Sequence, residues 1–213
     1  MKIMHVDTSP KEDWSNSRSL SHAFIEQLRD LVPDLEVDYL DLNIHTPAHV
    51  TRDFAIATYA LPEDRTPEMK AALRESDELC HRLLRADACV FAMPMYNWSV
   101  PSRFKAYIDA ITRPGVTYKQ QDGRIIGQLS RQKVLFITTR GADLRSGPYA
   151  DMDALTPVLK ASFKFIGVDA PSFVDAQPLQ FSDQTARAEA LARARSELSA
   201  VARHWTADLR QAA

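Results

Sequence analysis

Cysteine is scarce in this chain. The sequence has only Cys80 and Cys89, and they form no CxxC pair. So few and unpaired cysteines argue against a disulfide framework or a CxxC redox motif, and a reducing, cytoplasmic setting is the simpler interpretation. We expect both thiols to fill space in the core.

The chain also has little excess charge and no long apolar run. Its formal net charge is −2 over 213 residues, which predicts neither a nucleic-acid partner nor an anionic membrane surface. No apolar run approaches the length of a membrane-spanning helix. The apolar stretch at the N-terminus ends at Asp7, which is too short for a signal-peptide core, so it predicts a first strand.

Several fingerprints of catalysis and nucleotide binding are missing. There is no GxGxxG, no GxxxxGK[ST] and no GxSxG, and no Ser–His–Asp order can be identified. His45 and His49 have an HxxxH spacing, but Pro47 between them opposes the helix that would align them, so we predict no metal there. His5 lies inside the first predicted strand and is expected to be a core histidine. The sequence requires no side-chain acid or base.

What the chain does have is a regular alternation of strands and helices. Apolar runs predict strands at 2–6, 35–40, 88–93, 133–139 and 170–177. Helical spacing of apolar residues predicts helices at 17–32, 67–85, 101–112, 151–166 and 184–206. The segment 41–66 reads as irregular, and 116–129 predicts a hairpin that turns at Asp122–Gly123.

This order predicts the fold class. The first, third and fourth strands are nearly continuous apolar runs, as parallel strands buried on both faces require. We therefore predict a single α/β domain over residues 1–213, with a doubly wound, five-stranded parallel sheet and helices on both faces. Ligands of such sheets bind at the carboxyl ends of the strands, near the switch point in strand order.

The loop after the first strand is rich in serine. Ser9, Ser15 and Ser17 are hydroxyl donors at or just before a predicted helix start, where unpaired N–H groups and the helix dipole favour an anion such as phosphate. The alternative is that Ser15 or Ser17 only caps the helix.

The loop after the third strand, "PMYNWS", carries aromatic and amide side chains. Asn97 offers an amide donor and acceptor, and Tyr96 and Trp98 offer flat faces, which suits a planar heteroaromatic ligand. Alternatively, Trp98 packs on the helix that follows and Ser99 caps it.

The loop after the fourth strand contains Gly141, which permits a positive φ or a close backbone approach. Thr139 and Arg140 can reach a ligand edge, although Arg140 also fits a solvated surface charge. Together, a phosphate loop, an aromatic–polar loop and a glycine loop at neighbouring strand ends suggest flavin mononucleotide (FMN).

The motifs also resemble a known family. "PMYNW", "SVPSRFKAYIDAITRPGVTY", "VLFITTRGA", "LTPVLKASFKFIGV" and the early serines are similar, in order and spacing, to the FMN-dependent NADH-azoreductases, which are flavodoxin-like NAD(P)H:quinone oxidoreductases. The resemblance covers nearly the whole chain. Thr139, Ala142 and Trp98 depart from the residues that the family commonly has.

The resemblance implies a flavodoxin-like homodimer that takes hydride from NADH or NADPH and reduces quinones and azo compounds. It implies FMN contacts by Ser9, Ser15, Asn16, Ser17, Met95, Tyr96, Asn97, Trp98, Thr139, Arg140, Gly141 and Ala142. The hairpin with Tyr118 and the aromatic Phe163 and Phe165 are the expected dimer contacts, with a place in the monomer core as the alternative for both Phe residues.

Two other functions stay open at this point. One is a flavodoxin-like electron carrier without its own substrate turnover, for which a strongly acidic rim would be expected. The other is a binding module in which flavin is vestigial or absent. No motif decides between NADH and NADPH or identifies the electron acceptor.

Overall fold

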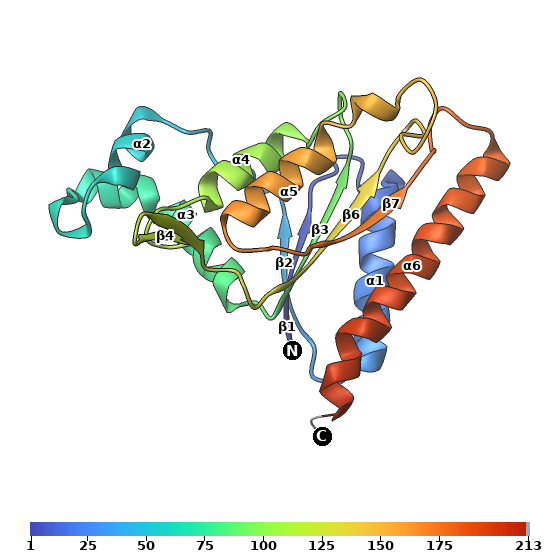
Figure 1. Cartoon of the computed structure of the whole chain (residues 1–213), viewed down its shortest axis with the longest axis horizontal. Helices are drawn as coiled ribbons and strands as arrows, with labels where there is room; N and C mark the ends of the chain where they lie inside the picture. The colour runs from blue at the N-terminus through green and yellow to red at the C-terminus, as the bar shows by residue number, and fades with distance from the viewer. Residues whose placement is uncertain (212–213) are drawn as a thin grey trace.

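Five parallel strands form the centre of the molecule within the described residues. The computed structural model describes residues 1–211, with side chains to residue 207, so the last two residues of the predicted domain lie outside it. The strand order is β2-β1-β3-β6-β7 (Figure 1). The strands are β1 Lys2–Asp7, β2 Glu36–Asp41, β3 Ala88–Pro94, β6 Lys133–Thr139 and β7 Ser172–Ala176. The predicted five-stranded parallel sheet is confirmed.

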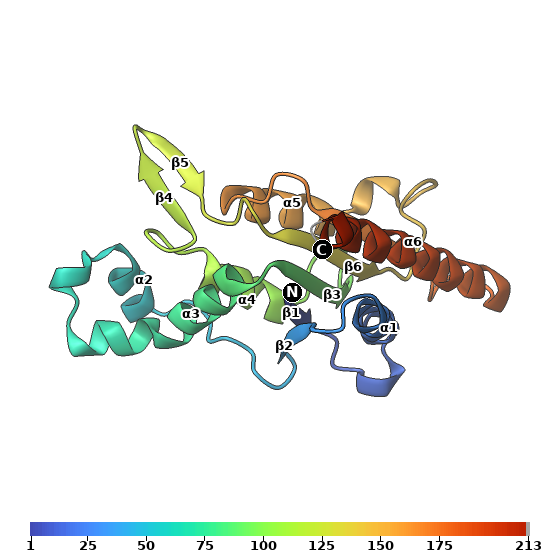
Figure 2. The same ribbon diagram turned by 90° about the horizontal axis from the view of Figure 1, so that it is seen from below.

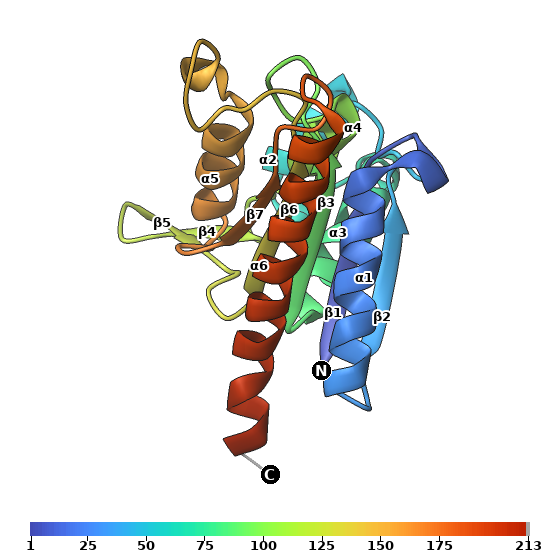
Figure 3. The same ribbon diagram turned by 90° about the vertical axis from the view of Figure 1, so that its right-hand side faces the viewer.

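Helices cover both faces of the sheet (Figure 3). α1 (Asn16–Leu31) and α6 (Gln184–Gln211) lie side by side on one face. The other face carries α3 (Pro67–Arg85), α4 (Ser102–Ile111) and α5 (Leu155–Phe165). Each layer buries its own apolar cluster against the strands, so β1, β3 and β6 are buried along almost their whole length. This is the burial that their continuous apolar sequences predict.

The strand order reverses at β1. The chain passes from β1 to β2 on one side and then returns to β3 on the other side of β1. The switch point therefore lies between the carboxyl ends of β1 and β3, which is where ligands bind in open sheets of this type.

A β-hairpin and three short 3₁₀ turns lie outside the central sheet and its covering helices (Figure 2). The predicted hairpin is confirmed as β4 (Tyr118–Gln121) paired with β5 (Arg124–Gly127), and its turn residues have the positive φ values of 50° and 73° that such turns need. Single 3₁₀ turns, η1 (Glu12–Trp14), η2 (Pro62–Asp64) and η3 (Ala150–Met152), precede α1, α3 and α5.

The prediction that 41–66 is irregular is wrong for one segment. Arg52–Tyr59 forms helix α2, which packs on α3. The Thr51 hydroxyl accepts a hydrogen bond from the Phe54 N–H and so caps the helix. The predicted helix at 151–166 starts late, at Leu155, because η3 occupies its first residues.

The predicted core residues are confirmed for both cysteines and for His5, all of which are buried. No helix among the described residues combines the length and apolarity needed to cross a membrane.

The two phenylalanines of α5 have different environments. Phe163 is buried, with its ring 5.0 Å from that of Phe91 and 4.8 Å from that of Phe136, so its expected place in a dimer contact is wrong. Phe165 is 41% exposed and touches the Tyr118 ring, at 4.6 Å between centroids. Residues two apart on a helix are rotated by about 200°, which explains the contrast.

This contrast gives a stability prediction. Phe163→Ala removes a ring from a close-packed aromatic cluster and is expected to lower the free energy of unfolding by about 3–5 kcal/mol. Phe165→Ala, the matched control on the same helix, should cost about 1 kcal/mol or less, because its ring is partly in water already. Urea unfolding followed by circular dichroism measures both, and equal losses would contradict the packing described.

Candidate functional site

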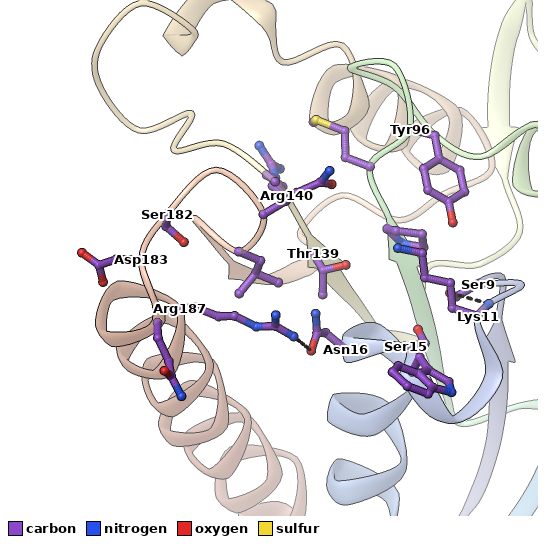
Figure 4. Close-up of a pocket in the computed structure, with 17 residues that line it drawn as sticks. Ser9, Lys11, Ser15, Asn16, Tyr96, Thr139, Arg140, Ser182, Asp183 and Arg187 are labelled. Atoms are coloured by element: carbon purple, nitrogen blue, oxygen red, sulfur yellow. Dashed lines mark hydrogen bonds between the residues drawn. The ribbon is translucent and has the colours of Figure 1, made fainter.

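The carboxyl edge of the sheet opens into a cleft of about 660 Å³ (Figure 4). It lies between the loops that follow β1, β3, β6 and β7 and the starts of α1 and α6. Of the residues predicted to contact a cofactor, the cleft is lined by Ser9, Ser15, Asn16, Met95, Tyr96, Thr139, Arg140 and Gly141.

The loop after β1 ends in a capped helix start. The Ser15 hydroxyl accepts a hydrogen bond from the Arg18 N–H at 3.3 Å and lies 3.1 Å from the Ser17 hydroxyl. The capping interpretation is therefore confirmed for Ser15. The cap pairs the Arg18 N–H, while the N–H groups of Asn16 and Ser17 before it have no acceptor within the helix. Free N–H groups at a helix start favour an anion. Ser17 itself is buried and lies outside the lining of the cleft.

A second helix start lies beside the first (Figure 3). Asp183 caps α6 by accepting a hydrogen bond from the Ala186 N–H at 2.8 Å. One turn along, the Arg187 guanidinium donates to the Asn16 side-chain oxygen at 3.4 Å and so joins α6 to α1 (Figure 4). Lys11 adds another cation to the lining. Apart from the Asp183 carboxylate, which caps α6, the charges at this end are the positive helix starts and the Lys11 and Arg187 cations, which together favour an anion.

The loop after β3 is a tight turn in an unusual conformation. Tyr96 and Ser99 exchange both backbone hydrogen bonds at 3.0 Å, and Asn97 and Trp98 have φ values of 47° and 70°. A turn with two positive φ values normally takes Asn or Gly, and Trp there is an outlier. Outliers of this kind persist only where surrounding contacts enforce them, and they gather at functional sites.

Trp98 is held by the segment that precedes α5. Its ring stacks on Tyr149 with 5.6 Å between centroids, and its carbonyl oxygen accepts a hydrogen bond from the Ala154 N–H at 2.9 Å. The alternative in which Ser99 caps α4 is wrong, because Pro101 occupies the cap position and Ser99 closes the turn instead. Tyr96 and Met95 line the cleft, whereas Asn97 and Trp98 lie outside its lining.

The loop after β6 is fixed by a buried guanidinium. Arg140 is 3% exposed, so its interpretation as a solvated charge is wrong. It donates to the Asp153 carboxylate at 2.8 Å, to the Thr156 hydroxyl at 2.7 Å and to the Asp175 carboxylate at 3.3 Å. Burial disfavours the charged Asp153, but hydrogen bonds from Thr156 and Arg140 outweigh it and lower the pKa of this carboxyl. The network ties β6, β7 and the start of α5 together.

Gly141 permits a close backbone approach. Its carbonyl oxygen accepts hydrogen bonds from the N–H groups of Gln180 and Phe181, at 3.0 and 2.9 Å. A Cβ at Gly141 would lie 3.2 Å from the Phe181 ring and 3.3 Å from the Gln180 Cβ, and the φ of Gly141 is not positive. The close approach, rather than backbone freedom, accounts for the glycine. Ala142 is buried outside the lining of the cleft.

Sequence reasoning missed one whole wall of the cleft. The segment after β7 contributes Leu179, Gln180, Ser182, Asp183, Gln184 and Arg187, and the first loop also contributes Lys11 and Trp14. The available signal was Ser182–Asp183 just before a long helix, which is the cap of a helix N-terminus at the same edge of the sheet. Trp14, which directly precedes Ser15 in the sequence, was a second signal. In the structure this large apolar side chain is 88% exposed.

Comparison with known proteins agrees with this architecture. A family model described as "Flavodoxin-like fold" matches residues 1–201. The chain belongs to this flavodoxin-like family.

Sequence relatives cover almost the full length of the chain. It is 40% identical over 205 residues to a Nostoc sp. protein named "FMN-dependent NADH:quinone oxidoreductase", covering 95% of this chain and 99% of that one. A protein of the same name from Methylocella silvestris is 33% identical, covering 91% and 95% of the two chains.

Solved structures share the fold. An FMN-dependent NADH-azoreductase from Bacillus anthracis, solved in complex with FMN, superposes with a TM-score of 0.85 at 23% identity, covering 96% of this chain and 99% of that one.

Proposed function

We propose that this protein is an FMN-dependent oxidoreductase that takes hydride from NADH and reduces quinones and azo compounds. The observation that carries the proposal is the cleft itself, which has an anion site between two helix starts at one end and the exposed Tyr96 beside Met95 at the other. The relatives named as FMN-dependent NADH:quinone oxidoreductases, at up to 40% identity over nearly the whole chain, support the same activity.

The residues fit FMN by their chemistry. The start of α1 and the hydroxyl groups of Ser9 and Ser15 would hold the terminal phosphate, with Asn16 and Ser17 supplying main-chain N–H groups. Met95 and Tyr96 would border the planar ring on one side, and Thr139, Arg140 and Gly141 on the other. The cleft volume lies within the range of small-molecule sites.

The division of labour is simple. Bound FMN supplies the hydride chemistry, and the chain binds it, orients it and shapes the access of donor and acceptor. Arg140 contributes through position, because its guanidinium is already engaged by two carboxylates and a hydroxyl. Its main-chain N–H and carbonyl oxygen are also paired, with the Ala176 carbonyl and the Leu179 N–H, so Arg140 shapes the loop rather than offering a free donor.

A pure electron carrier is the second candidate, and a binding module the third. A carrier docks protein partners through a strongly acidic rim, but the net charge of the chain is only −2, and Lys11 and Arg187 line the cleft. We therefore favour the enzyme.

We also propose that the protein is a cytoplasmic homodimer. The hairpin exposes Ile125 and Ile126, and Phe165 with Tyr118 extends this apolar surface. Such patches mark contacts more often than free surface.

Kinetics test the activity directly. The purified protein should carry FMN, and initial rates with NADH at several quinone concentrations should give parallel double-reciprocal lines, because one cleft must serve donor and acceptor in turn. Intersecting lines would rule out the alternating cycle. No bleaching of the flavin absorbance by NADH would favour the carrier.

Substitution at the helix start tests the phosphate site. Ser15→Ala should weaken FMN binding by about 1–3 kcal/mol, the range for hydrogen bonds to a charged group. Thr66→Ala is the matched control, because the Thr66 hydroxyl caps α3 in the same way but lies outside the cleft. Both should lose about 1 kcal/mol of stability as caps, but only Ser15→Ala should change the Kd in a fluorescence titration. Equal FMN affinity in both variants would show that Ser15 is a cap alone.

Light scattering tests the dimer. Wild-type protein should give a mass near twice 24.0 kDa. Ile126→Glu places a charge in the proposed contact and should shift the mass toward the monomer, whereas Ala200→Glu on the exposed side of α6 should not. A fully active wild-type species at monomer mass would defeat the proposal.

A further inference from the structure

Three side chains of metal-ligating types converge on β1 and α1, outside the lining of the cofactor cleft. His5 and Asp7 lie two residues apart on β1 and so project to the same face of the sheet, which α1 covers. His22 projects from α1 toward them, with its Nε2 2.9 Å from one Asp7 carboxylate oxygen. None of the three lines the cleft.

The spacing of their ligand atoms suits a metal ion. The ligand atoms of the three side chains all lie within 4.8 Å of one another. The His5 Nε2 is 3.4 Å from the second Asp7 oxygen. Ligands at about 2.0–2.1 Å in tetrahedral geometry are roughly 3.3 Å apart, so these two separations bracket the distance that a shared ion needs.

His5 supplies an independent sign of a missing partner. The residue is 2% exposed, yet its Nε2 has no hydrogen-bond partner among the described residues. Buried polar atoms of this kind are rare and need an explanation. The nitrogen lies 3.4 Å from an Asp7 carboxylate oxygen, beyond normal hydrogen-bond geometry, and within 4.8 Å of the His22 ligand atom.

Neighbouring hydroxyl groups hold the Asp7 carboxylate in a fixed orientation. The Ser21 hydroxyl donates to one Asp7 oxygen at 2.8 Å and the Tyr39 hydroxyl to the other at 3.0 Å, which fixes the carboxylate from outside. Arg18 is the nearest competing cation, but it lies 3.8 Å from Asp7 and is engaged by Asp41 at 2.7 Å.

We propose that His5, Asp7 and His22 form a binding site for a divalent first-row transition-metal ion, with Zn²⁺ as the best match to two imidazoles and one carboxylate. The His22 side chain is 57% exposed, so it gives the ion a route from solvent and leaves a position open to water. The bound ion joins α1 to β1 just before Ser9, and so stiffens the loop that leads into the cofactor cleft.

The simpler alternative is a hydrogen-bonded pair in which a proton takes the place of the ion. The hydrogen bond to Asp7 raises the pKa of His22. Burial opposes ionisation of Asp7, but the hydrogen bond from His22 and the proximity of the His5 ring, 3.4 Å away, outweigh it and lower the pKa of Asp7. A proton and a metal thus compete for His22. A proton shared by His22 and Asp7 would still leave the buried His5 Nε2 with only a 3.4 Å contact to Asp7. A metal ion would give this nitrogen a partner.

Calorimetry with Zn²⁺ separates the two. The flavin-loaded protein, without a histidine tag and first stripped with a chelator, should bind one equivalent of Zn²⁺. His22→Gln should bind at least 10-fold more weakly, since even an outer-shell change costs about 10–100-fold. His45→Gln with His49→Gln is the matched control, because it removes two histidines outside the cluster and should leave the affinity unchanged.

Thermal melting and X-ray absorption provide a second test in case a variant folds poorly. Zn²⁺ should raise the Tm of the wild-type protein and not that of His22→Gln, as expected for a ligand that binds only the folded state. X-ray absorption of the Zn²⁺-loaded wild type should show two imidazole ligands. Absence of Zn²⁺ binding, equal binding by His22→Gln, or loss of binding in the His45/His49 control would each overturn the proposal.

Discussion

Parallel pairing of β1, β3 and β6 is the constraint on which the rest of the structure depends. It places the carboxyl ends of strands that end at Asp7, Pro94 and Thr139 at one edge, although they are far apart in the sequence. α1 starts at that edge as the helix that follows β1, and α6 starts there as the helix that follows β7, the last parallel strand. An anion site then follows from backbone geometry, because two helix ends leave their first N–H groups unpaired in one place.

A second constraint shapes the ring side of the cleft. The turn 96–99 holds two non-glycine residues at positive φ, a conformation that costs about 1–3 kcal/mol for each residue. The Trp98–Tyr149 stack and the Trp98–Ala154 hydrogen bond hold it in place. Arg140 fixes the same segment through Asp153, so the turn and the loop after β6 are supported by one network. The aromatic loop is held in place because Trp98 packs on Tyr149, while Tyr96 of the same loop lines the cleft.

Much of this was predictable because parallel strands buried on both faces leave a strong pattern. Ala88–Pro94 and Lys133–Thr139 are continuous apolar runs, and the sheet, its edge and three of its loops follow from them. Helix α2 was missed because eight residues between prolines carry little periodicity. The wall after β7 was missed because its residues are ordinary polar ones, and only the strand order shows that they reach the same edge. Local sequence could not separate Trp98, which supports the turn, from Tyr96, which lines the cleft, because that depends on contacts with residues some 50 positions away.

Under the proposed function, the start of α1 holds the phosphate of FMN, with the hydroxyl groups of Ser9 and Ser15 beside it. A crystal structure of the protein with bound FMN should show the phosphate within hydrogen-bonding distance of the main-chain N–H groups of Asn16 and Ser17, with the ring between the loops after β3 and β6. A phosphate bound elsewhere, or a ring lying outside the cleft, would contradict this placement.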